Sequence, residues 1–402
     1  MRACLPLCFL LACGFAFGQP ASEAFVLQGG AVHTISGPII ENGSVLVRDG
    51  KIVAVGRNLT PPEGYRVIDV RGRHIYPGMI DSASMLRSDR IPFTRANGVT
   101  TVVELPDGDL IAGQLSVIRL DGATPEKMTV SPVAALHLRF PSINRVPIRP
   151  HEADEEDEDP NYQAEPIPYS QAKKDHDNKL KTLNKFFDDA RSYQRRKQAK
   201  PPNFQTNPKF EALLPVLEGS LPMFVTAVRE REIREAIQFS DRQRIRIILA
   251  DPYECYKVLP LIKSHNISVV LGPTMTLPLD RDDPYDRSFA TPGELYRAGI
   301  PFSIGTFGAR SSHNLPYQAA AAVPYGLPKE EAYKAVSLHA AQTFGLGKRL
   351  GSIEEGKAAD LLVTDGDPLE IQTHLTMLFI DGKLISLETR EKTLSDKYMN
   401  AR

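Results

Sequence analysis

Between residues 76 and 345, short apolar runs alternate with helical stretches, and no other feature of the sequence constrains the fold as strongly. Strands that alternate with helices are typical of βαβ units and a parallel sheet. Strands are expected at 79–80, 100–104, 133–138, 223–227, 245–250, 268–271 and 301–305. Helices are expected between several of them, at 230–240, 255–264, 292–297 and 329–344. About eight strand positions over roughly 270 residues predict an α/β protein with a distorted TIM-like (β/α)8 barrel.

Both ends of the folded chain carry closely spaced short strands instead. Asp49-Gly50 separates two runs that pair as a hairpin, and Asp381-Gly382 does the same near the other end. Two segments that are distant in sequence but share this pattern of short strands and hairpins most simply pack together as one β-structure. We therefore expect a composite β-sandwich built from both termini, residues 24–75 and 346–390, beside a barrel of residues 76–345.

The first 18 residues are predicted to be a signal peptide. An arginine is followed by an almost wholly apolar stretch, and Ala16-Phe17-Gly18 fits a cleavage site before Gln19. A buried N-terminal helix is the structural alternative, but Pro6 fits it poorly. A lipoprotein anchored through Cys13 is a second alternative, since residues 10–13 resemble a lipidation box. With either processing signal the protein is exported, and the periplasm is the expected location.

The composition of the chain excludes several kinds of binding partner and several kinds of structural site. Lys and Arg number 48 against 49 Asp and Glu, a balance that argues against nucleic-acid binding. No apolar run after residue 18 approaches the ~20 residues that span a bilayer, so no transmembrane segment is expected in the mature chain. Three cysteines lie in the signal region and leave Cys255 alone, which excludes an intrachain disulfide and a multi-cysteine zinc site.

An acidic segment interrupts the barrel pattern at residues 143–170. Seven of the eight residues from 152 to 159 are Asp or Glu, and such a run predicts a solvated loop. Calcium binding is the alternative, although the sequence has no Asp-x-Asp-x-Asp-Gly loop. A basic stretch follows at 173–197, with Leu180, Leu183, Phe186 and Phe187 at helical spacing, which predicts an amphipathic helix on the exterior of the barrel.

Four motifs together resemble one known family. They are YPGMID at 76–81, RANGVTTV at 95–102, GSIEEGKAADLLV at 351–363 and FIDG at 379–382. In order and spacing they are similar to the amidohydrolase superfamily, in particular to its imidazolonepropionase-like and dihydroorotase-like branches. The resemblance covers about residues 24–390 apart from the acidic segment, and it implies hydrolysis of non-peptide C–N bonds such as those of cyclic amides.

The resemblance also implies zinc or another divalent metal at the C-terminal ends of the barrel strands. Family ligands are a His-x-His pair on strand 1, often a Lys or Glu on strand 4, a His on each of strands 5 and 6, and an Asp on strand 8. The matching residues of this chain are Ala83, Met85, Thr226, Asp251 and Phe307. One thioether, one hydroxyl and one carboxylate are a poor donor set for such an ion, so no metal and no other cofactor is expected.

Other side chains are candidates for residual chemistry at the barrel mouth. Asp251, Glu104 and His137 are the candidates for an acid/base pair, and the sequence assigns no catalytic residue beyond these candidates. The candidate pocket residues that line the mouth are Thr226, Asp251, Tyr253, Phe307 and His313.

Three functions follow. The first is an exported amidohydrolase-family pseudoenzyme with a degenerate site, which binds an unidentified small molecule or an intact amidohydrolase homologue. The second is a metal-independent or single-metal hydrolase of C–N bonds that uses Asp251, Glu104 and His137. The third is a structural subunit of an active homologue.

Overall fold

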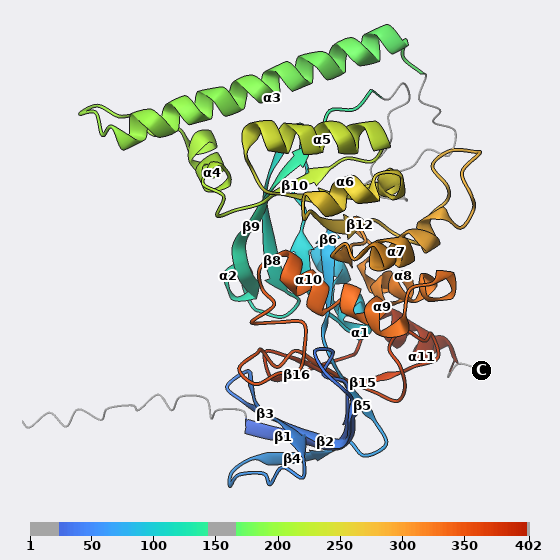
Figure 1. Cartoon of the computed structure of the whole chain (residues 1–402). Coiled ribbons are helices and arrows are strands. Elements are labelled where there is room, and N and C mark those ends of the chain that lie inside the picture. The colour runs from blue at the N-terminus through green and yellow to red at the C-terminus, as the bar shows by residue number, and fades with distance from the viewer. Residues whose placement is uncertain (1–23, 144–165, 400–402) are drawn as a thin grey trace, which may run out of the picture.

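The computed structural model describes residues 24–143 and 166–399. The predicted signal peptide, Cys13 and most of the acidic segment lie outside these residues. The described chain forms two eight-stranded sheets (Figure 1), one at the centre of the larger body and one in the smaller body below it.

The larger sheet is the predicted barrel. Its order is β13-β12-β11-β10-β9-β8-β7-β6. Its strands are β6 (Met79–Ser84), β7 (Val99–Glu104), β8 (Ile111–Arg119), β9 (Thr129–Arg139), β10 (Met223–Thr226), β11 (Ile247–Ala250), β12 (Ser268–Leu271) and β13 (Phe302–Ile304). The backbone N–H of Phe307 donates to the carbonyl of Ala83 at 2.8 Å and joins the end of β13 to β6. This contact brings the two edges of the sheet together.

The strand β8 was not predicted, and it runs antiparallel to both of its neighbours. Only residues 105–110 separate it from β7, which is too short for the crossover that a parallel strand needs. The strand predicted at 133–138, taken as the third, therefore occupies the fourth place, whereas β10, β11 and β13 stand fifth, sixth and eighth as expected.

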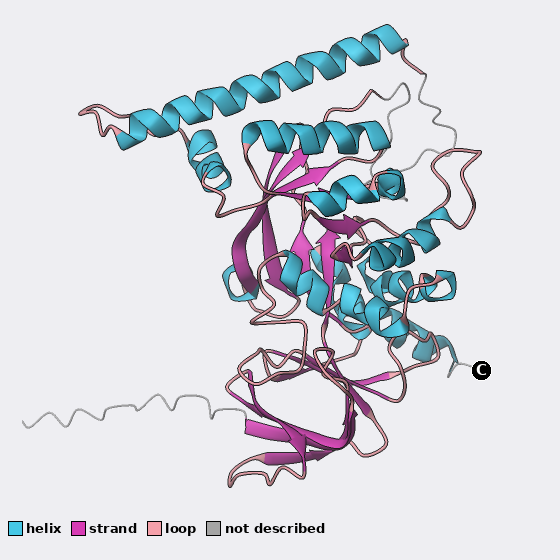
Figure 2. Cartoon of the chain, viewed as in Figure 1, coloured by secondary structure: helices cyan, strands magenta, loops and turns pink. Residues whose placement is uncertain are grey.

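Helices cover the outside of the barrel (Figure 2). They are α1 (Ile91–Ala96), α2 (Pro125–Met128), α3 (Tyr169–Gln198), α4 (Pro208–Leu217), α5 (Glu230–Gln243), α6 (Leu259–Ser264), α7 (Arg287–Ala298), α8 (Leu315–Ala321), α9 (Lys329–Ala335) and α10 (Leu338–Thr343). The single helix expected at 329–344 is broken, because the Val336 carbonyl accepts a hydrogen bond from the backbone of Ile80. A last helix, α11 (Arg390–Met399), was not predicted.

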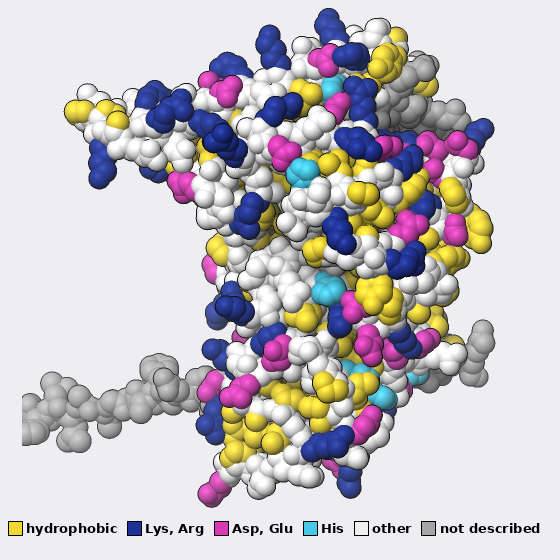
Figure 3. Space-filling model, in the orientation of Figure 1, with side chains coloured by type: hydrophobic (Ala, Val, Ile, Leu, Met, Phe, Trp, Pro, Cys, Tyr) yellow, Lys and Arg dark blue, Asp and Glu magenta, His cyan; other side chains and the backbone are white. Residues whose placement is uncertain are grey.

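The basic stretch forms α3, the longest helix, which lies across the end of the barrel away from the smaller sheet (Figure 1). It begins at Tyr169, inside the segment expected to be an acidic loop. Leu183, Phe187 and Tyr193 are buried along one face, while Lys and Arg side chains gather on its exposed side (Figure 3). The predicted amphipathic exterior helix is confirmed.

The smaller sheet combines both ends of the chain, as predicted. Its order is β16-β15-β14-β5-β1-β2-β3, and β4 also pairs with β1. The strands are β1 (Ala24–Val32), β2 (Ile40–Arg48), β3 (Lys51–Arg57), β4 (Arg66–Asp69), β5 (His74–Pro77), β14 (Leu361–Thr364), β15 (Leu375–Ile380) and β16 (Lys383–Ile385). The Ile52 N–H donates to the Lys357 carbonyl, so the sheet curls back on itself, and Phe25 stacks on Phe379 in its core with ring centroids 4.7 Å apart.

None of the described helices combines the length and the apolar composition that crossing a membrane requires.

Candidate functional site

Apolar side chains occupy the interior of the barrel near the C-terminal ends of its strands. Ala83 from β6, Phe224 from β10 and Phe307 just after β13 belong to one buried hydrophobic cluster. The Phe224 and Phe307 rings lie nearly parallel, with centroids 6.3 Å apart, and Phe307 is only 1% exposed. Side chains alternate between the two faces of a strand, so these residues point inward while their neighbours pack against the outer helices.

This cluster includes two of the five positions that correspond to family metal ligands. Ala83 has no donor atom, and Phe307 places an aromatic ring among apolar neighbours. Met85, a thioether, packs against the same cluster. Within residues 24–143 and 166–399, no three His, Cys, Asp or Glu side chains are grouped as a metal site requires. The donors present do not fit a divalent metal of the family type.

Thr226, a fourth of these positions, contacts His137. The Thr226 hydroxyl lies 2.9 Å from Nε2 of His137, and Nδ1 lies 3.3 Å from the Pro106 carbonyl. Burial lowers the pKa of His137 to about 4, so the ring is neutral at pH 7. Because a carbonyl only accepts, Nδ1 carries the proton and Nε2 accepts from Thr226. The β9–β10 pairing places these two predicted residues together.

Thr226→Val is expected to lower the free energy of unfolding by about 1–2 kcal/mol, because it leaves the buried Nε2 of His137 without a donor. Chemical denaturation of the variant and the wild type measures the difference. Thr182→Val on the exposed face of α3 is the matched control, with an expected change within about 0.5 kcal/mol. Equal losses in the two variants would contradict a specific hydrogen bond to His137.

Two carboxyl groups lie where β6 and β7 meet. Asp81 is fully buried and accepts hydrogen bonds from the backbone N–H and the hydroxyl of Thr306, at 2.9 and 2.6 Å. Burial raises the pKa of Asp81 to about 6. Burial, assisted by the charge of Asp81, raises the pKa of Glu104 to about 7. Oε2 of Glu104 is buried and has no hydrogen-bond partner among the described residues.

The charged residue that influences Glu104 is therefore Asp81. In the sequence, Asp81 stood out only as part of a family motif. Its one signal was an ionisable residue inside an apolar strand that is buried on both faces. Such a residue must find polar partners or shift its pKa, and Asp81 does both.

Asp251 and Tyr253 lie together just after the C-terminal end of β11. They line a cavity of about 30 Å³ between the ends of β11 and β12, enough for a water molecule and too small for a substrate. A Cβ atom at Gly272 would lie 2.1 Å from the Asp251 carboxylate, so a larger residue there would have to displace that carboxylate. The Tyr253 hydroxyl accepts a hydrogen bond from the Leu279 backbone. His137 and Glu104 do not line this cavity.

His313 lies apart from the other candidates. It sits in a short 3-10 turn (Ser312–Asn314), packs against Phe93 of α1 at 4.4 Å between ring centroids, and its carbonyl accepts a hydrogen bond from Asn97. Burial lowers its pKa. Of the predicted pocket residues, Thr226 and Phe307 thus lie in the barrel interior, Asp251 and Tyr253 line the small cavity, and His313 packs against α1.

Comparison with known proteins agrees with the motifs. The sequence pattern described as the amidohydrolase family matches residues 254–387. An imidazolonepropionase of Thermoplasma volcanium is 33% identical over 139 residues, which cover 32% of this chain and 33% of that protein. An adenine deaminase of Geobacillus kaustophilus is 35% identical over 94 residues, which cover 22% of this chain and 15% of that protein. The chain therefore matches a third or less of the length of these relatives.

Solved structures match over almost the whole chain. An amidohydrolase from Thermotoga maritima MSB8 superposes with a TM-score of 0.76 at 22% identity, over 90% of this chain and 99% of that one. The ochratoxinase of A. niger superposes with a TM-score of 0.57 at 16% identity, over 90% and 95%. At such identities the likeness shows the fold. The family match over residues 254–387, the partial curated relatives and the shared fold together support the amidohydrolase superfamily for this chain.

Proposed function

We propose that this chain is an exported pseudoenzyme of the amidohydrolase superfamily, which binds a small molecule or an intact homologue and does not perform metal-dependent hydrolysis of C–N bonds. One observation carries the proposal. The Phe307 ring is buried in one apolar cluster with Phe224 and Ala83, at the position that the resemblance assigns to the strand-8 Asp, and this packing supports the loss of the metal site. Export rests on the signal peptide expected at residues 1–18.

A metal-independent hydrolase is the second candidate, and Glu104 favours it. A carboxyl group whose pKa is raised to about 7 can donate and accept a proton near neutral pH, as general acid/base catalysis requires. However, neither His137 nor Glu104 lines the small cavity that contains Asp251 and Tyr253. Asp81 is fully buried and accepts a hydrogen bond from the Thr306 hydroxyl, so its carboxylate is not open to a substrate. The pseudoenzyme is therefore the better supported function.

The purified mature protein is expected to retain far less than one equivalent of zinc, iron or manganese after dialysis against each ion. Elemental analysis by mass spectrometry measures the metal, and hydrolysis of dihydroorotate and of N-acyl amino acids is assayed in parallel. No activity is expected with or without added metal, because the donor set does not hold an ion.

Two variants make the result interpretable. His374→Ala removes an exposed imidazole outside the barrel, so metal that disappears in this variant was bound to the surface. Asp251→Ala removes the one carboxylate at a ligand position. Stoichiometric metal that is lost together with hydrolysis in Asp251→Ala, but kept in His374→Ala, would overturn the pseudoenzyme and establish an unusual metal enzyme.

A further inference from the structure

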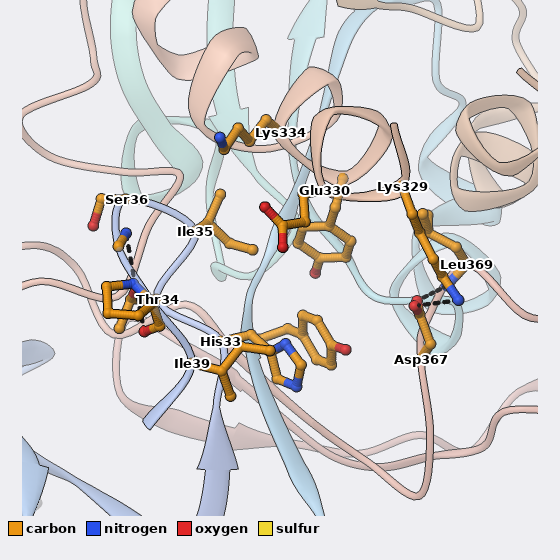
Figure 4. Close-up of a pocket in the computed structure, with 14 residues that line it drawn as sticks. His33, Thr34, Ile35, Ser36, Ile39, Lys329, Glu330, Lys334, Asp367 and Leu369 are labelled. Carbon is orange, nitrogen blue, oxygen red and sulfur yellow. Dashed lines mark hydrogen bonds and ion pairs between the residues drawn. The ribbon is translucent and has the colours of Figure 1, made fainter. Parts of the chain in front are cut away.

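A pocket of about 550 Å³ lies between the smaller sheet and α9 (Figure 4). Its volume is in the range of small-molecule sites. One wall is the turn between β1 and β2, including Ile35 and Ile39, and the opposite wall is α9. The pocket adjoins Tyr76, which precedes the N-terminal end of β6, whereas Phe307 and Thr226 lie at the C-terminal ends of their strands. It is a different site from the barrel mouth.

Aromatic rings held in fixed positions form part of the pocket lining. His33 stacks on Tyr76, with ring centroids 3.9 Å apart, and Tyr76 lies 5.0 Å from Tyr333. The Tyr333 hydroxyl donates to the Pro77 carbonyl at 2.7 Å, and Nε2 of His33 lies 3.0 Å from Nδ1 of His74. These contacts keep the rings in place before a ligand arrives, which reduces the entropic cost of binding.

The imidazole of His33 adds no positive charge to the pocket at neutral pH. Burial, together with the neighbouring His74, lowers the pKa of His33 to about 4. The ring therefore serves as an uncharged surface that is apolar on its face and polar at its edge.

The cationic groups of the lining are already paired with carboxylates. Lys329 binds Asp367 and Glu370, at 2.9 and 3.0 Å, and Lys334 binds Glu331 at 2.8 Å.

Glu330 differs from these residues. It is exposed and makes no ion pair with any other residue in the described part of the chain. In Figure 4 its carboxylate points across the pocket toward Ile35, whereas the Lys329 ammonium group reaches Asp367. The pocket thus offers one uncompensated negative charge beside apolar and aromatic surface.

We propose that this pocket binds a small organic cation, an amine or a guanidinium group attached to an apolar or aromatic body. The cation would pair with Glu330, and the body would cover Ile35, Ile39 and the His33 ring. An anionic compound of the same shape is disfavoured, since Glu330 repels it and both lysines are engaged. The site does not depend on the state of the barrel, so it stands or falls separately from the pseudoenzyme.

Phenethylamine and phenylacetate are the matched probes, since both carry a phenyl ring on a short chain and differ in charge. Isothermal titration calorimetry with the full mature chain is expected to detect phenethylamine at millimolar concentration or below, with at least about tenfold weaker binding of phenylacetate. Glu330→Gln is expected to weaken phenethylamine about tenfold, because it removes a charge-assisted hydrogen bond. Glu63→Gln, at an exposed glutamate outside the pocket lining, is the control and should leave the affinity unchanged.

Ile39→Arg provides a second variant, since Ile39 is 45% exposed and its replacement leaves the core intact. It places a cation in the pocket and is expected to abolish phenethylamine binding. Absence of phenethylamine binding, equal affinity for the two probes, or an unchanged affinity in Glu330→Gln or Ile39→Arg would each overturn the proposal.

Discussion

Phe307→Ala is expected to lower the free energy of unfolding by about 3–5 kcal/mol, the largest single effect predicted for this chain. The ring is 1% exposed and packs in a cluster with Phe224 and Ala83, so its removal leaves a cavity inside a closed barrel that cannot collapse freely. Phe307 has a φ of +53°, in the left-handed region. Alanine keeps the backbone penalty of that conformation, so the loss reports packing rather than relief of strain.

Urea denaturation followed by circular dichroism measures the change. Leu277→Ala is the matched control, because Leu277 is 86% exposed and its truncation should cost no more than about 0.5 kcal/mol. A loss below about 1 kcal/mol for Phe307→Ala would mean that the ring does not fill the barrel end. The space for a metal would then be open, and the observation that carries the pseudoenzyme would fail.

Glu104→Gln is expected to make the protein more stable than the wild type at alkaline pH and not at acidic pH. The pKa of Glu104 is raised from 4.5 to about 7 in the folded state, so between these values the folded state binds more protons than the unfolded state. Stability of the wild type therefore falls as the pH rises through this window. Glutamine stays neutral and escapes the loss, which we expect to reach about 2 kcal/mol.

Unfolding free energies at several values from about pH 4.5 to about pH 8 test this difference. Asp81, whose pKa is raised to about 6, lowers stability in the same direction, but it is present in both proteins and largely cancels in the comparison. Glu63→Gln controls for the loss of one exposed charge. Curves for wild type and Glu104→Gln that stay parallel across the range would contradict burial of the Glu104 carboxyl group.

Most of the barrel could be predicted from sequence because its parallel strands are buried on both faces. Such strands form continuous apolar runs, as in 247–250 and 269–271, and helices separate most of them. The alternation of strands and helices does not predict β8, because no helix lies between β7 and β8. Only the short connection from β7, residues 105–110, forces it to run antiparallel.

The sequence by itself determined the chemical identity of the site. It specified Ala83, Met85, Thr226 and Phe307 at positions that match, by the sequence resemblance, the metal ligands of the amidohydrolase family. A methyl group or a phenyl ring has no donor atom in any fold. It also determined both hairpins of the smaller sheet, because Asp49-Gly50 and Asp381-Gly382 favour tight turns through local backbone geometry alone.

Only the tertiary structure decided which of these side chains meet. Thr226 contacts His137 because β10 pairs with β9 in one register. The charge of Asp81 raises the pKa of Glu104 because β7 pairs with β6. The pocket at Glu330 joins a turn of the smaller sheet to α9, although almost 300 residues separate them in the sequence. Local patterns report the periodicity and the chemistry of a segment, whereas contacts between distant segments depend on strand order, register and barrel closure, which are set when the whole core packs.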